Sequence, residues 1–111
     1  MAKQRDDFVD LIVDNLQLFC PATAKRMFGG YGIFCGDLMF ALIIAGELYV
    51  KVDDENRNLF EEKGLEKFSY LRQGKTCYLS YYTVPEEVID DLDTLSYWAG
   101  LGYEAALRAN N

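Results

Sequence analysis

The chain has 111 residues, half of them apolar, which is the size of one globular domain with a single core. Eighteen acidic and eleven basic residues give a net charge of −7, so the average surface repels nucleic acid and anionic membranes. Composition therefore disfavours direct DNA binding by this domain alone, and no apolar run is long enough to span a membrane.

Two further features concern the cellular compartment. The first ten residues, "MAKQRDDFVD", carry acidic side chains where a signal peptide would have its apolar region. Cys20, Cys35 and Cys77 are odd in number, widely spaced and accompanied by no histidine. We therefore expect a cytoplasmic protein with reduced, mostly buried thiols rather than a disulfide framework or a zinc site.

An opening helix is predicted over residues 6–20. Four apolar residues fall on one stripe of this helix, opposite acidic ones: Phe8, Ile12, Leu16 and Phe19. Pro21 ends the helix, and residues 22–28 are expected to be extended and short.

Three strands are predicted next, joined by the turn pairs Gly36-Asp37 and Ala45-Gly46 into an antiparallel meander. Their ranges are 31–35, 38–44 and 47–52. The middle strand contains no polar residue, as expected of a central strand covered on both faces. The third strand alternates apolar with polar residues and should be half solvated.

A helix and a hairpin follow the meander. Residues 53–55 are acidic and should cap a helix that runs to about Lys63, with Gly64 ending it in a left-handed conformation. Two β-rich segments, 68–72 and 76–82, are joined around Gln73-Gly74 as a hairpin.

The last part of the chain is predicted to be helical. Thr83 and Glu86 have the spacing of a capping box, with Pro85 in the first turn of a short helix. Asp93 or Thr94 should cap a final helix that reaches about residue 108.

Gly100 and Gly102 each cost this final helix about 1 kcal/mol relative to alanine, which packing must offset. The predicted order, α-β-β-β-α-β-β-α, defines a two-layer α+β domain with an antiparallel sheet.

The glycines Gly29, Gly30 and Gly32 admit two interpretations. A phosphate-binding loop needs a strand before it and a helix N-terminus after it, but here a strand follows and no Gly-Lys-Ser/Thr occurs. A backbone bend that leads into the meander is the favoured reading.

Catalytic and metal-binding chemistry finds little support. The carboxylate pairs at 61–62, 86–87 and 90–91 are adjacent in predicted helices, so they do not converge on one point. The thiols lie outside helix N-termini and have no histidine beside them. We expect a solvated acidic face, and no catalytic, cofactor or metal site.

Cationic and aromatic residues are the candidates for contact with a partner. Tyrosines of the second hairpin lie near basic residues, a mixture suited to stacking on bases or to a protein interface, although cross-strand packing explains the same residues and is the favoured interpretation. A helix, or a second subunit in a homodimer, could cover the face of the hairpin that carries these tyrosines. The candidate contact residues are Arg26, Tyr31, Arg72, Lys75, Tyr78 and Tyr82.

Three stretches together resemble the N-terminal domain of the TfoX/Sxy family, regulators of bacterial competence genes. They are "KRMFGGYGIF", "MFALIIAGELYVKVDDENRNLFEEKG" and "FSYLRQGKTCYLSYYTVPEEVIDD". The resemblance covers about residues 10–108. It implies a compact α+β domain of the secretion-chaperone type, with residues 1–111 as a single domain. The family usually has a C-terminal domain, which we expect to be absent here, so the chain would be either an excised domain or a natural single-domain relative.

The resemblance also implies a role in transcriptional activation together with the cyclic-AMP receptor protein. We therefore expect a non-enzymatic co-regulator of competence genes that acts through contacts with that protein or with RNA polymerase. Direct DNA binding is the main alternative and would need five cations on one face: Lys25, Arg26, Lys51, Arg72 and Lys75. An interaction domain of an unrelated pathway, or an enzyme whose cleft gathers a thiol and two carboxylates, are further alternatives.

Overall fold

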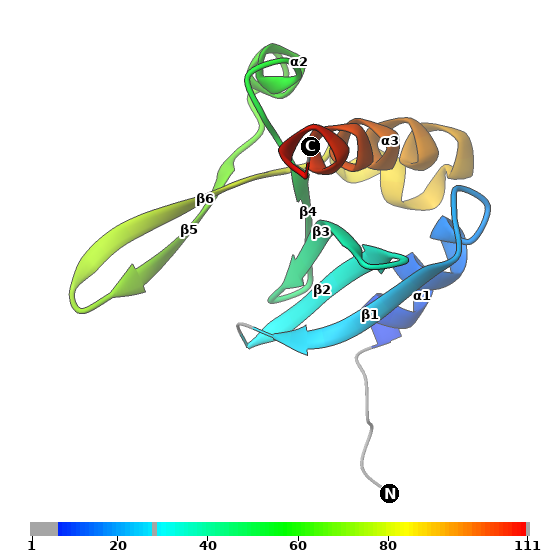
Figure 1. Cartoon of the computed structure of the whole chain (residues 1–111), viewed down its shortest axis with the longest axis horizontal. Helices are drawn as coiled ribbons and strands as arrows, with labels where there is room; N and C mark the ends of the chain where they lie inside the picture. Colours follow the sequence, from blue (N-terminus) through cyan, green and yellow to red (C-terminus); the bar gives the residue numbers. More distant parts are fainter. Residues whose placement is uncertain (1–6, 28, 111) are drawn as a thin grey trace, which may run out of the picture.

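The structure, a computed structural model, describes residues 7–27 and 29–110. A six-stranded antiparallel sheet has the strand order β1-β2-β3-β4-β6-β5, and helices α1 and α3 cover one of its faces (Figure 1). The elements in chain order are α1 (Asp7–Leu16), β1 (Ala22–Met27), β2 (Gly30–Cys35), β3 (Leu38–Ile44), β4 (Glu47–Lys51), α2 (Arg57–Glu61), β5 (Lys67–Arg72), β6 (Lys75–Thr83), the 3-10 helix η1 (Glu86–Asp90) and α3 (Leu92–Ala109). The predicted α+β class is confirmed.

Segment 22–27 corrects the predicted element order, which was one strand short. It forms β1, which pairs with β2 over its whole length, from Ala22 opposite Cys35 to Met27 opposite Gly30. Ala22 is buried and Ala24 half-buried, while Thr23 and Lys25, which alternate with them, are exposed. Alanine is a weak marker of strands, so sequence periodicity did not reveal this one.

Helix α1 is shorter than predicted at its C-terminal end. Its regular part stops at Leu16, whose carbonyl then accepts hydrogen bonds from the amides of Phe19 and Cys20 in a turn. The Phe19 ring still reaches the core, where it lies 5.8 Å from the Phe40 ring and 5.7 Å from the Tyr103 ring.

Strand β3 is covered on both faces, as predicted. A bulge places Phe40 as an extra residue between the β2 pairings of Met39 and Ala41, so Phe40 and Ala41 both join the core beneath the helices. On the other face, hereafter the outer face, Leu42 is fully buried against Phe68 and the β6 residue Tyr81. The half-solvated character of β4 is also confirmed, because its buried and half-buried residues alternate.

Helix α3 packs across β3 and β4 and completes the core. Leu95, Trp98 and Ala99 are buried there, and the Trp98 ring meets the Phe60 ring of α2 edge-on at 4.9 Å. The backbone of α3 comes closest to the sheet at Gly102, where an added Cβ would lie 2.9 Å from the Phe40 carbonyl oxygen. No helix in the described part of the chain is long and apolar enough to cross a membrane.

The predicted start of α2 is wrong by several residues. Asp53 does not cap a helix that begins beside it; its Oδ1 accepts hydrogen bonds from the amides of Glu55 and Asn56 in a tight turn, and the helix begins at Arg57. Gly64 has a φ of +71°, which confirms the predicted left-handed residue after the helix.

The caps predicted around the last two helices are also corrected. The hydroxyl of Thr83 accepts a hydrogen bond from the Glu66 amide, so it is engaged between strands and forms no capping box. Asp91, rather than Asp93 or Thr94, caps α3. Its carboxylate accepts hydrogen bonds from the backbone amides of Asp93 and Thr94. Several acidic residues compete at this boundary, and spacing alone does not choose among them.

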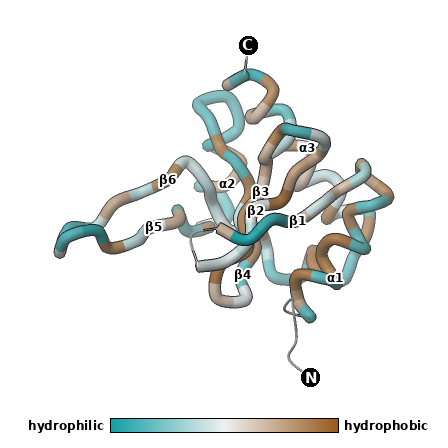
Figure 2. The backbone as a smooth tube through the Cα atoms, turned by 60° about the horizontal axis from the view of Figure 1, so that its bottom comes forward, coloured by the Kyte–Doolittle hydropathy of each residue, from teal (hydrophilic) through white to brown (hydrophobic). Residues whose placement is uncertain are grey.

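The predicted hairpin is confirmed and extends away from the body of the domain (Figure 1). Gln73 and Gly74 have φ values of +53° and +79°, as a two-residue turn between twisted strands requires. Figure 2 shows the hydrophilic end of this hairpin far from α1 and α3.

Candidate partner-contact surface

The six predicted contact residues fall in two separate regions of the sheet. Arg26 and Tyr31 are register partners on β1 and β2, with the guanidinium carbon 5.8 Å from the centre of the tyrosine ring. Arg72 and Lys75 are register partners beside the turn of the β5–β6 hairpin. The hairpin lies at the other end of the strand order from β1.

Tyr78 and Tyr82, although both on β6, have opposite surroundings. The Tyr78 side chain is 61% exposed, with the Lys67 ammonium 5.6 Å from its ring centre. Tyr82 is 5% exposed, and its hydroxyl donates a 3.0 Å hydrogen bond to Oε2 of Glu61. Burial and this carboxylate raise the pKa of Tyr82. The contact surface described below therefore leaves Tyr82 out.

The reason for this difference is the length of the pairing between β4 and β6. Strand β4 pairs with β6 only from Tyr81 to Thr83. Tyr82 thus lies within the main sheet, against the Phe60 ring, whereas Tyr78 lies beyond the last residue that β4 covers. Strand alternation places both tyrosines on one face but does not show where the neighbouring strand ends.

A hollow of about 460 Å³ lies against the projecting hairpin. It is lined by Phe68, Tyr70, Leu71, Arg72 and Leu79. Leu71 is 75% exposed, the most exposed large apolar side chain among the described residues. Leu71 is not among the predicted contact residues, since an apolar residue in a predicted strand is expected to be buried.

Strand β5 forms one edge of the sheet. It pairs with β6 on one side, and no strand of the described chain pairs with it on the other. Such an edge presents backbone donors and acceptors that an additional strand can use. We call β5, the hollow beside it and the exposed residues Arg72, Lys75 and Tyr78 the hairpin surface.

Charge is distributed unevenly between the sheet and the rest of the chain. Within the six strands Glu47 is the one acidic residue, against six cationic residues: Lys25, Arg26, Lys51, Lys67, Arg72 and Lys75. The other carboxylates of residues 7–27 and 29–110 lie in helices, turns and loops. The net charge of −7 therefore conceals a sheet whose strands are basic.

The cations of the sheet do not all share one face. Lys25 lies over the Phe34 ring at 4.9 Å and Lys51 over the Tyr81 ring at 5.2 Å, both on the outer face. Arg26, next to Lys25, alternates to the opposite face. Burial raises the pKa of Tyr81 to about 12, so this ring is neutral beneath Lys51.

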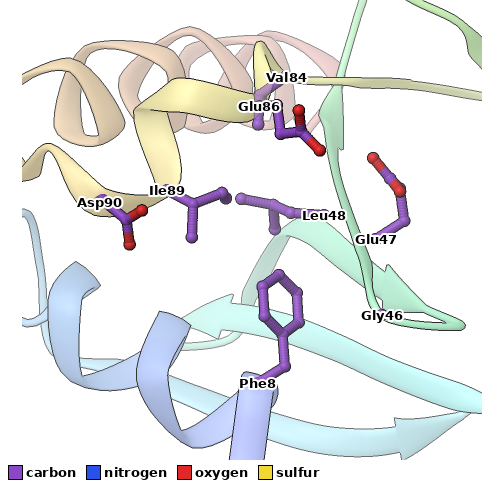
Figure 3. Close-up of a pocket in the computed structure, with 8 residues that line it drawn as sticks. All are labelled: Phe8, Gly46, Glu47, Leu48, Val84, Glu86, Ile89 and Asp90. Atoms are coloured by element: carbon purple, nitrogen blue, oxygen red, sulfur yellow. The ribbon is translucent and has the colours of Figure 1, made fainter.

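A second hollow, of about 260 Å³, is acidic. Phe8 of α1 points toward Leu48 and Ile89, and the carboxylates of Glu47 and Glu86 lie around the opening (Figure 3). None of the residues that line this hollow is a cysteine. Among residues 7–27 and 29–110, no three His, Cys, Asp or Glu side chains gather as a metal site. That the chain is not an enzyme stays a prediction.

The glycines have the structural place expected of them, whereas the thiols, expected to be mostly buried, are only half-buried. Gly29, with a φ of +76°, follows β1 and begins the turn into β2, so the predicted bend is confirmed. A Cβ on Gly30 would meet the carbonyl oxygen of Ile43. All three cysteines are free and half-buried. Burial, and then the neighbouring Cys35 thiol, raise the pKa of Cys20 to about 12.

The fold and the surface together define an α+β domain with a half-covered antiparallel sheet and a projecting hairpin. Its sequence matches the TfoX N-terminal domain over residues 14–106, and the chain belongs to that family. It is similar to the DNA transformation protein TfoX1 of Aliivibrio fischeri, with 39% identity over 62 residues. The aligned part covers 56% of this chain and 30% of that relative.

Proposed function

We propose that this chain is a non-enzymatic regulatory domain of DNA transformation, and that it co-regulates competence genes through contacts with the transcription machinery. Membership of the TfoX N-terminal domain family and the name of the Aliivibrio relative support the link to transformation. The partner we propose is the cyclic-AMP receptor protein or RNA polymerase. This role would place the chain in the cytoplasm.

The observation that carries the mode of action is the hairpin surface. Leu71 and Tyr78 are 75% and 61% exposed on a projecting hairpin, beside Arg72 and Lys75. Arg72 shares its face with the hollow, whereas Tyr78, the register partner of Ser69, lies on the opposite face of the hairpin. Exposed aromatic, aliphatic and arginine side chains on one projecting element are typical of protein interfaces. Strands β5 and β6 contain no Asp or Glu, so the hairpin is positively charged although the whole chain is negatively charged.

The test is a transformation assay in a competent bacterium that lacks its own gene of this family. Expression of the chain should raise the transformation frequency and the level of competence transcripts. The immobilised chain should also retain purified cyclic-AMP receptor protein or purified RNA polymerase. Unchanged transformation together with failure to retain either protein would contradict the proposal and would favour an interaction domain of an unrelated pathway.

Direct DNA contact is the second candidate, and the basic strands are the observation that favours it. A duplex DNA shift assay over a series of salt concentrations would test it, because binding through phosphates weakens steeply with salt. Arg26 faces away from Lys25 and the whole chain is acidic, so we expect no specific shift.

A further inference from the structure

The free edge of β5 bears three features that suit one kind of ligand. First, the strand has unpaired backbone N–H and C=O groups along its free edge, the edge that does not pair with β6. An extended peptide can add a strand to such an edge, with main-chain hydrogen bonds supplying affinity and neighbouring pockets supplying specificity.

Second, the apolar hollow lies beside this edge. Its apolar lining consists of the buried Phe68, the half-buried Leu79, the partly exposed Tyr70 and the exposed Leu71. A volume of about 460 Å³ admits apolar side chains of an added strand. Leu71 and Leu79 offer aliphatic contacts for Val or Leu side chains, and Phe68 is only 7% exposed and stacks against Tyr70. Little flat aromatic surface is therefore open for the bases of single-stranded nucleic acid.

Third, the hairpin is positively charged. Between Lys67 and Pro85 the sequence has three cationic residues and no Asp or Glu. Two copies that met through their hairpins would bring these cations together, and like charges facing each other across strands are destabilising. An acidic strand would place its carboxylates beside Arg72 and Lys75 instead.

From these features we propose that the hairpin surface binds an extended acidic peptide segment that adds a strand to the edge of β5, with apolar residues along one half and carboxylates along the half nearer the hairpin turn. This inference rests on the proposed function, because it names the chemistry of the segment that a protein partner would supply. The carboxylates lie near Arg72 and Lys75, and the apolar side chains enter the hollow.

The experiment uses the full 111-residue chain, isotope-labelled for NMR, and a synthetic Glu-Val peptide, with Val residues in one half and Glu residues in the other. We expect amide shifts concentrated in Lys67–Arg72 and an affinity that falls as salt is added. Two matched peptides should bind at least about tenfold more weakly, a difference near 1.4 kcal/mol. One carries Lys in place of Glu, and the other is N-methylated at alternate backbone amides.

Protein variants provide the matching controls. The double variant Arg72→Glu, Lys75→Glu should lose at least about tenfold in affinity for the Glu-Val peptide. Lys63→Glu reverses an exposed charge at the end of α2, outside the hairpin, and should change affinity less than about twofold. The exchanged side chains are exposed, so thermal unfolding should show that all three proteins remain folded.

Other results would overturn the inference. Among these are absence of binding, equal binding of the N-methylated peptide, and shifts centred outside β5. Tighter binding of oligothymidine than of the Glu-Val peptide would assign the surface to nucleic acid. Light scattering that shows a dimer which the double variant dissociates would assign it to a second copy. If the peptide fails but the chain still retains a transcription protein, the docking mode fails and the proposed function stands.

Discussion

Gly100 and Gly102 lie two residues apart in α3, yet their surroundings differ. A Cβ on Gly100 would meet only the edge of the Phe19 ring at 3.6 Å, which is ordinary contact. A Cβ on Gly102 would lie 2.9 Å from the Phe40 carbonyl oxygen and 2.9 Å from the Val50 Cβ. Close packing of the helix on the sheet therefore offsets the helical cost of Gly102, whereas Gly100 has no comparable close contact.

Alanine at these two positions should have opposite effects on the free energy of unfolding. Gly100→Ala should stabilise the domain by about 0.5–1 kcal/mol, because alanine favours the helix and restricts the unfolded chain. Gly102→Ala should destabilise it by about 1–3 kcal/mol, because α3 must move off β3 and β4. Urea unfolding of the two variants measures both values, and equal effects would contradict this account of the packing.

Thiol reactivity is a second property set at the residue scale. Because burial and the Cys35 thiol raise the pKa of Cys20 to about 12, its thiolate is scarce near neutral pH. At about pH 8, iodoacetamide should label Cys20 at least about tenfold more slowly than Cys77 on the projecting hairpin. Mass spectrometry of peptides from partly labelled protein measures the two rates. In urea the rates should become similar, and equal rates in the folded protein would argue against the thiol environment described here.

At the scale of elements, β6 serves two purposes along its length. Its last residues belong to the core, where Tyr82 contacts Phe60 and hydrogen-bonds to Glu61. Its first residues belong to the hairpin that extends beyond β4 and carries Tyr78. Stability thus depends on one part of this strand, and the partner contact that we propose depends on another part.

Alanine at the two tyrosines of β6 should separate these purposes. Tyr82→Ala should lower the free energy of unfolding by about 3–5 kcal/mol, because it empties a site in the aromatic core. Tyr78→Ala should change the same quantity by no more than about 0.5 kcal/mol, because the ring is largely exposed. Thermal and urea unfolding provide the measurement. A large loss for Tyr78→Ala would mean that the hairpin supports the fold rather than a partner.

At the scale of the whole molecule, one ion pair ties the C-terminal end of α3 to the turn after β4. Nε and Nη2 of Arg108 donate to the two carboxylate oxygens of Asp53 at 2.6 and 2.8 Å. The hydrogen bond from Arg108 is the main cause that lowers the pKa of Asp53 below its usual 3.8, although partial burial opposes the shift. Residues 55 positions apart in sequence are held together in this way.

This pair predicts a specific dependence of stability on pH. A carboxyl whose pKa is lower in the folded state stabilises that state fully above its unfolded pKa, near 3.8, and the contribution is lost as the pH falls through the folded value. Asp53→Asn should therefore lower the urea midpoint at neutral pH. The difference from the unchanged chain should shrink below about pH 4. A difference that stays constant down to acid pH would show that the charge of Asp53 is not what stabilises the pair.

Much of the fold could be predicted from the sequence, because most elements have local causes. Periodicity located α1 and the strands β2 to β4, and Gly64 and the Gln73-Gly74 pair marked turns whose φ values are positive. Strand β1 was missed because its inward residues are alanines, and the Asp91 cap was missed among several nearby acids. Of the candidate contact residues, Tyr82 was indistinguishable from Tyr78 until the end of β4 was known.

By itself the sequence determined the α+β class, the bend at the glycines and the membership of the TfoX N-terminal family, since these depend on local backbone chemistry and on motifs along the chain. Only the tertiary structure decided which aromatic residues are exposed, which glycine contacts the sheet, and that the basic residues concentrate in the strands. The physical reason is that exposure and charge environment depend on what lies across a contact, and those neighbours come from distant parts of the chain.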